Sequence, residues 1–74
     1  MNDLSTQREY NRKLSEFLSE LSKLQKKHLE QVQVVEKLPS DHYQLSAEMA
    51  RLYDIEIEIS DLVTESSETL NFYK

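Results

Sequence analysis

The chain has 74 residues, which suffices for one domain but leaves little apolar area for a core. Its fourteen acidic and nine basic residues give a net charge of −5. That balance argues against nucleic-acid binding, because a phosphate backbone is neutralised by clustered Lys and Arg. Cysteine and glycine are absent, which excludes disulfides and thiolate metal sites and disfavours phosphate-cradling loops. We therefore expect a domain without a cofactor that gains stability from a partner chain.

No stretch of the sequence approaches the ~20 consecutive apolar residues that a membrane-spanning helix needs. Residues 1–14 also lack the apolar segment of a secretory signal peptide. The sequence therefore predicts a cytoplasmic protein without membrane insertion.

The first half of the chain predicts one long helix over residues 4–38. Thr6 and Glu9 have the spacing of a capping box, and Asp3 is an alternative N-cap. Apolar residues then recur at steps of three and four, as they do on the core-facing side of a helix. They are Tyr10, Leu14, Phe17, Leu18, Leu21, Leu24, Leu29, Val32, Val35 and Leu38.

His28 interrupts this apolar stripe. An imidazole at that position is either a pH switch or metal ligand, or a hydrogen-bonded residue at a helix contact. The second interpretation is favoured, because the sequence offers no cluster of fellow ligands.

A short break at Leu38–Ser40 divides the chain. Pro39, the only proline, disfavours helical geometry in the residue before it. Ser40 is a predicted N-cap for a second helix, with Asp41 in its first turn near the positive helix end. Because so short a break folds two helices back on each other, residues 1–74 are predicted to form one all-α domain, an antiparallel two-helix hairpin.

The second predicted helix spans about 41–66. Within it, residues 54–60 read DIEIEIS, which alternates like a half-buried strand. A strand is disfavoured there, because a strand needs a partner and nothing else in the chain alternates in this way. On a helix, one apolar stripe faces the first helix. The predicted core is therefore Leu14, Phe17, Leu18, Leu21, Leu24, Val32, Val35, Leu45, Met49, Leu52, Ile55, Ile59, Leu62 and Val63.

A second, narrower stripe lies roughly opposite, and we call it the outer row: Tyr43, Ala50, Tyr53 and Ile57. An exposed apolar strip with two tyrosines is typical of a protein contact surface. The alternative is that the tyrosines merely lie along the flank of the hairpin, since scattered apolar residues are normal on surfaces.

Charge differs between the halves. Residues 1–38 hold seven basic and six acidic side chains, whereas residues 39–74 hold two basic and eight acidic ones. The acidic second helix should pair with the first and should steer a basic partner.

The last residues, 67–74, are predicted to form a frayed tail, since termini are often poorly ordered. As an alternative, Leu70, Phe72 and Tyr73 dock on a partner.

No pattern of catalysis is present. Glu56 and Glu58 are a candidate acid–base pair, but residues two apart on a helix point to different sides. The serines do not fall into a nucleophile-elbow pattern, and without glycine there is no phosphate-binding loop. We expect a binding protein and not an enzyme.

The sequence resembles the small co-chaperones of the needle protein in bacterial type III secretion systems. The most specific match is Pro39-Ser40-Asp41-His42-Tyr43-Gln44, in which Asp41, Tyr43 and Gln44 take the places of a polar residue, an aromatic and a glutamine that open the second helix. The long first helix and the aliphatic run over 55–63 are also similar to that family.

The resemblance implies binding to a chaperone built from tetratricopeptide-like helical repeats. That pair would hold the needle subunit soluble and unpolymerised in the cytoplasm, and the outer row is the predicted contact. Members of the family also self-associate when unpartnered, so a homodimer is implied. The alternative function is a self-associating coiled-coil adaptor without a chaperone role. A third hypothesis, a small helical regulator that blocks an enzyme or a transcription factor, has no residues that point to a target.

Overall fold

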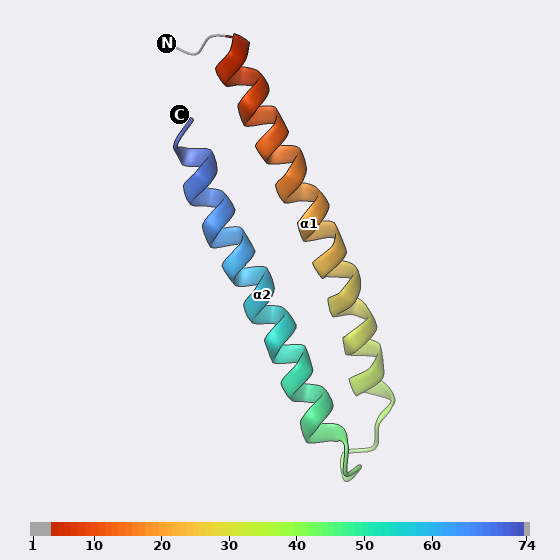
Figure 1. Ribbon diagram of the computed structural model, residues 1–74. Helices are drawn as coiled ribbons and strands as arrows, with labels where there is room; N and C mark the ends of the chain where they lie inside the picture. Colours follow the sequence, from red (N-terminus) through yellow and green to blue (C-terminus); the bar gives the residue numbers. More distant parts are fainter. Residues whose placement is uncertain (1–3, 74) are drawn as a thin grey trace.

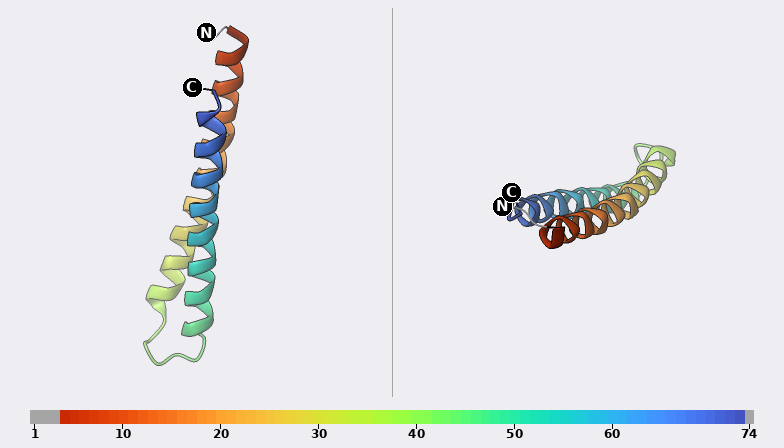
Figure 2. Two further views of the ribbon diagram at one scale, coloured as in Figure 1. Left: turned by 90° about the vertical axis from the view of Figure 1, so that its left-hand side faces the viewer. Right: turned by 90° about the horizontal axis from the view of Figure 1, so that it is seen from above.

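The computed structural model describes residues 4–73 and consists of two antiparallel helices (Figure 1). Helix α1 spans Leu4–Lys37 and helix α2 spans Leu45–Asn71. The molecule is a rod 59 Å long in which the two helices lie side by side from the loop to the termini (Figure 2). The predicted all-α hairpin is confirmed. Residues 54–60, which alternate like a strand, are helical throughout.

The two helices meet along a contact seam with a heptad spacing. Half-buried residues of α1 recur at alternating steps of four and three, which is the repeat that keeps one edge of a helix against a partner. They are Tyr10, Leu14, Phe17, Leu21, Leu24, His28, Gln31 and Val35, and the repeat continues to Leu38 just after the helix. The matching positions on α2 are Leu45, Glu48, Leu52, Ile55, Ile59, Leu62 and Ser66.

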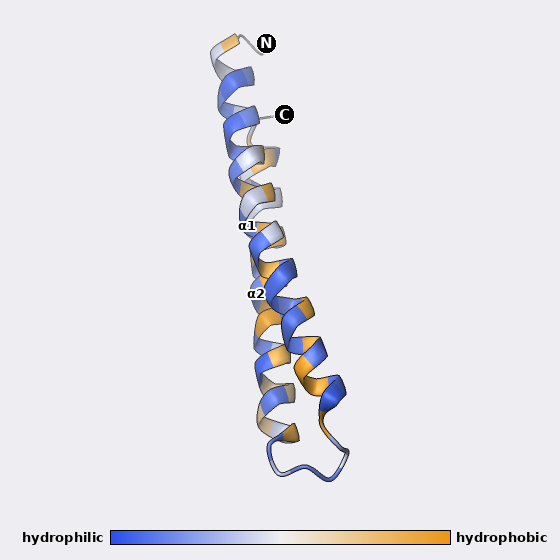
Figure 3. Ribbon diagram, turned by 90° about the vertical axis from the view of Figure 1, so that its right-hand side faces the viewer, coloured by the Kyte–Doolittle hydropathy of each residue, from blue (hydrophilic) through white to orange (hydrophobic). Residues whose placement is uncertain are grey.

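The core of the described chain is thin. Ile55 is the only buried side chain, at 5% exposure, and the other apolar seam residues are half-buried. Two helices cannot enclose a side chain from all directions, so this result is expected of an isolated hairpin. Apolar residues gather in the half of the hairpin nearer the loop (Figure 3).

Two predicted core residues are corrected by the structure. Leu18 is 53% exposed and Val63 is 44% exposed. Each directly follows a seam residue, Phe17 or Leu62, and the heptad spacing brings only about two residues in seven into contact. Both therefore project to the side of the seam. The other predicted core residues are buried or half-buried.

A polar pair occupies the seam near the loop. The Gln31 side-chain amide donates to the Glu48 main-chain carbonyl and to its carboxylate, both at 2.8 Å. The Glu48 side chain is 16% exposed and also pairs with Arg51 at 3.2 Å. A polar pair inside an apolar seam favours one register, because sliding either helix leaves both groups without partners.

Replacing Gln31 with alanine is expected to lower the free energy of unfolding by about 1–3 kcal/mol, since the shielded Glu48 carboxylate loses its donor. Urea unfolding followed by circular dichroism measures the change. The matched control is Gln33→Ala, because Gln33 is exposed on the same helix and should change stability by less than about 0.5 kcal/mol. Equal stability of the two variants would contradict a structural role for the pair.

The connection between the helices is longer than predicted. Helix α1 ends two residues before Pro39, and α2 begins only at Leu45. The predicted N-cap is wrong: Ser40 lies in the loop, and the residue at the cap position is Gln44, which makes no side-chain cap hydrogen bond. The loop is closed instead by His42, whose N–H donates to the Pro39 carbonyl at 3.0 Å.

His42 also accepts a hydrogen bond at Nδ1 from the Gln44 N–H, at 3.0 Å. Its own carbonyl accepts from the Leu45 N–H at 3.1 Å. These contacts replace the capping contacts predicted for Ser40, so the loop reverses the chain before α2 starts.

Helix α1 starts where the predicted range 4–38 places it, but not at the predicted capping box. The helix begins at Leu4, so Thr6 lies inside it and Glu9 pairs with Arg12. The alternative cap, Asp3, lies outside the described residues. The Arg12 guanidinium holds the pKa of the Glu9 carboxyl below its ordinary value. That contact therefore supports the helix at neutral pH and is lost as the pH falls through the lowered pKa.

The predicted frayed tail is corrected over its described part. Helix α2 continues to Asn71, and the ring of Tyr73 lies edge-to-face with that of Tyr10, with the centroids 6.3 Å apart. Because α1 extends beyond this point, it offers the end of α2 an aromatic surface. Lys74 lies outside the described residues.

Candidate partner-binding surface

The outer row lies on the side of α2 that faces away from α1. Ala50, Tyr53 and Ile57 recur at steps of three and four between the seam positions and are exposed. Tyr53 is 55% exposed and Ile57 is 57% exposed, whereas Ile55 between them is buried. The helix thus presents two apolar surfaces, one covered by α1 and one open to solvent.

Tyr43 does not share this helical face. It precedes α2, lies in the loop and is highly exposed. Its ring stacks on that of His42, with the centroids 4.7 Å apart and the planes 20° apart. The prediction of one row of four side chains on the second helix therefore holds for three of them.

A shallow open hollow of about 510 Å³ adjoins the row at the loop end of α2. Ala50 and Tyr53 line it on one side, and the loop residue His42 contributes on the other. Leu45 and Met49 add apolar atoms to it. The hollow extends the apolar surface toward the loop, and sequence reasoning missed it because it depends on how residues 38–44 fold.

Acidic side chains on α2 differ in whether a side chain of α1 pairs with them. Glu56 accepts from His28 Nε2 at 3.1 Å, and Glu58 pairs with Lys27 at 3.7 Å. Within residues 4–73, Asp54 and Asp61 make no ion pair. Both are exposed on α2.

The two sides of the seam have different chemistry. Lys27 and Glu58 each precede a seam residue, and their ion pair marks the charged side. Leu18 and Val63 each follow a seam residue, so they lie on the opposite side. Leu29 is exposed and falls about three helical turns after Leu18, which places it on the same side of α1.

We call Leu18, Leu29 and Val63 the apolar flank. Sequence reasoning placed these residues in the stripe or the core, so it missed that they form a second exposed surface. The signal that distinguishes them is the strict heptad spacing, which includes Leu14, Phe17 and Leu21 but not Leu18.

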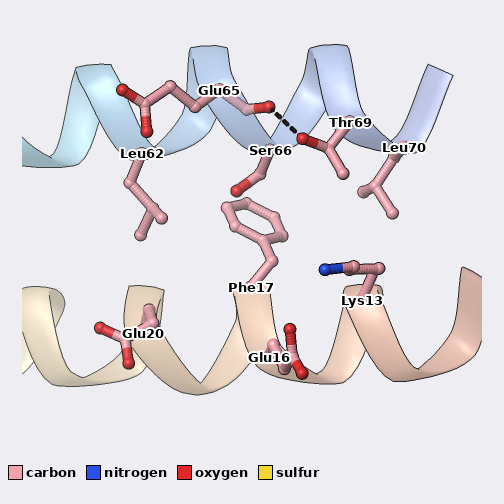
Figure 4. Close-up of a pocket in the computed structure, with 9 residues that line it drawn as sticks. All are labelled: Lys13, Glu16, Phe17, Glu20, Leu62, Glu65, Ser66, Thr69 and Leu70. Atoms are coloured by element: carbon pink, nitrogen blue, oxygen red, sulfur yellow. Dashed lines mark hydrogen bonds between the residues drawn. The ribbon is translucent and has the colours of Figure 1, made fainter. Parts of the chain in front are cut away.

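A groove of about 240 Å³ lies between the helices near their free ends (Figure 4). Phe17 points from α1 toward α2, where Leu62, Ser66 and Leu70 line the groove. The small Ser66 leaves this space open, because an apolar side chain would fill the same seam position. Thr69 donates its hydroxyl to the Glu65 carbonyl at 3.0 Å, so that hydroxyl is engaged by the helix itself.

The titratable groups of the hairpin are distributed singly or in pairs. His28 is partly exposed at the seam, where it meets Glu56. Glu56 and Glu58 contact different residues of α1, as their spacing predicts. No group of three or more His, Asp or Glu side chains converges within residues 4–73 to hold a metal ion. Neither helix, over the same residues, is long and apolar enough to cross a membrane.

Comparisons with models of protein families, with curated proteins and with solved structures give no match to this chain. The candidate functional surfaces are those of the hairpin itself: the outer row, the apolar flank and the loop that precedes α2.

Proposed function

We propose that this chain is a co-chaperone of a type III secretion needle subunit. In this role the hairpin binds a chaperone built from tetratricopeptide-like repeats through the outer row, and the pair keeps the needle subunit unpolymerised in the cytoplasm. The chain performs no chemistry and needs no cofactor. The observation that carries the proposal is the exposure of Tyr53 and Ile57 on the face of α2 opposite the seam.

The thin core supports this function. A hairpin with one buried side chain has little stability of its own, since a core of this size supplies roughly 3–5 kcal/mol at best. A partner that binds only the folded hairpin shifts the folding equilibrium toward it by mass action. A repeat protein gains in return, because its concave surface or its open end is covered by an additional helix.

The loop supports the same proposal. Asp41, Tyr43 and Gln44 carry the resemblance to the co-chaperone family. Tyr43 is exposed, and its ring stacks on that of His42, which lines the hollow at the end of the outer row. An exposed aromatic side chain is a suitable anchor for a protein contact.

The experiment that tests the function is affinity capture of the tagged chain from its native cells, with the bound proteins identified by mass spectrometry. We expect a helical-repeat protein together with a small needle-type subunit. Recovery of the tagged chain with only untagged copies of itself would contradict the proposal.

A second candidate function is a self-associating coiled-coil adaptor, and the apolar flank is the observation that favours it. Two hairpins that pack through this flank would form a four-helix bundle. Replacing Leu18 and Val63 with glutamate is expected to convert such an assembly to monomers, because charges would be buried at its centre. Light scattering coupled to size-exclusion chromatography measures the mass. A parent chain that is already monomeric at micromolar concentration would rule this function out.

A further inference from the structure

The outer row can pack against a helix of a partner protein. Ala50, Tyr53 and Ile57 form a ridge along one face of α2, and ridges at such spacings pack into the grooves of another helix. The hollow lined by Leu45 and Met49 continues this apolar surface toward the loop. A helix laid along α2 therefore meets apolar atoms over several turns.

Two carboxylates border this ridge. Asp54 lies one turn before Ile57 and Asp61 one turn after it, so both are helical neighbours of the same apolar side chain. Both are exposed, and neither makes an ion pair with a residue in 4–73. The nearby carboxylates of Glu56 and Glu58 already have partners on α1, His28 and Lys27. A partner that covers the outer row therefore has to compensate the negative charges of Asp54 and Asp61.

An uncharged or acidic partner is disfavoured at this surface. Covering a carboxylate without supplying a cation costs free energy, and placing a like charge beside it costs more. A second copy of this chain, with its own outer row turned inward, would bring Asp54 and Asp61 close to the same residues of the other copy. Self-association through the outer row is therefore disfavoured, in contrast to self-association through the apolar flank.

We infer that the element covering the outer row is a basic amphipathic helix, with apolar residues along one stripe and Lys or Arg beside it. This inference rests on the proposed function only in assigning the outer row as the contact surface, and it adds the chemistry of the partner. The apolar stripe covers Tyr53 and Ile57, and the cations pair with Asp54 and Asp61.

The test uses the full chain and two synthetic helical peptides of about 21 residues, a length that spans roughly 30 Å of helix. Both peptides carry the same leucine stripe, flanked by lysines in one and by glutamates in the other. Fluorescence anisotropy measures the dissociation constants at low and high salt. We expect the lysine peptide to bind at least about tenfold more tightly, and salt to weaken its binding.

Variants of the chain locate the contact. The double variant Asp54→Asn/Asp61→Asn should weaken binding of the lysine peptide about two- to tenfold and flatten its salt dependence. The matched control is Glu9→Gln/Glu36→Gln, which removes the same charge near the two ends of α1, away from Asp54 and Asp61 along the hairpin. That control should change the dissociation constant by less than about twofold, since exposed charges beyond a Debye length are screened.

Three results would overturn the inference: equal binding of the two peptides, no binding of either, or equal weakening by the aspartate and glutamate variants. These outcomes are separate from those of the proposed function. If binding of the captured chaperone requires Tyr53 and Ile57 but does not require Asp54 and Asp61, the proposed function stands and the inference fails. If no chaperone is captured but the lysine peptide binds as described, the inference stands and the function fails.

Discussion

Replacing Ile55 with alanine is expected to remove most of the stability of the isolated hairpin. Ile55 is the only buried side chain in the described chain, and truncating a buried isoleucine typically costs about 2–5 kcal/mol. A core of this size supplies only roughly 3–5 kcal/mol. At about 4–8 °C per kcal/mol, the thermal midpoint should fall by more than about 10 °C, or the cooperative transition should disappear.

Ile57 provides a matched control two residues away on the same helix. It is 57% exposed, so Ile57→Ala removes the same atoms without opening a cavity. We expect its free energy of unfolding to stay within about 0.5 kcal/mol of the parent. Circular dichroism during heating measures both variants. Equal destabilisation by the two alanines would mean that the helices do not pack along the seam described above.

Replacing both Tyr53 and Ile57 with glutamate is expected to abolish binding of the proposed helical-repeat partner while the chain stays helical. Apolar anchors at the centre of an interface often contribute about 2 kcal/mol or more each. Two lost anchors and two introduced charges should therefore weaken binding by more than about 100-fold. Neither side chain contributes to the seam, and glutamate is a good helix former, so helicity should be retained.

The control for this variant is Leu18→Glu/Leu29→Glu. It makes the same change of charge at two apolar residues of α1 with similar exposure. Isothermal titration calorimetry with the captured partner compares the two, and circular dichroism checks their helicity. Binding that survives the Tyr53 and Ile57 changes but is lost with the Leu18 and Leu29 changes would move the contact surface from the outer row to the apolar flank.

The helical hairpin was predictable from sequence because its signals are local. The apolar stripes repeat at helical spacing over many turns, and Pro39 divides them. Leu18 and Val63 were misplaced because a broad helical stripe and a heptad seam share most of their residues. The two patterns differ only at the positions that follow a contact residue. A broad helical stripe predicts a core residue there, whereas a heptad seam predicts an exposed one.

The loop and the tail could not be predicted, because their structures depend on contacts that local sequence does not reveal. Ser40 and Asp41 have the composition of a helix start, but the hydrogen bond between His42 and Pro39 closes a turn before the helix can begin. Just beyond the end of α2, the ring of Tyr73 contacts that of Tyr10, and the two residues are far apart in sequence. Helix propensities describe one segment at a time, so they do not predict either of these contacts.

The outer row was predictable as a pattern, and its acidic border was not. The sequence contains eight acidic residues in its second half, and only the pairing across the hairpin distinguishes those that have a partner on α1. Glu56 and Glu58 contact side chains of α1, whereas Asp54 and Asp61 make no ion pair with a residue in 4–73. This distinction requires the register of the two helices, which the pair of Gln31 and Glu48 favours.

Site-specific photo-crosslinking tests most directly whether the chain acts by binding a protein through the outer face of α2. A photoreactive benzoylphenylalanine is introduced in place of Tyr53 in one variant and in place of Leu18 in another, and both are irradiated in the native cell. We predict that position 53 forms a covalent adduct with the helical-repeat chaperone and that position 18 does not. An adduct with that chaperone from position 18 alone, or no adduct with another protein from position 53, would contradict this account.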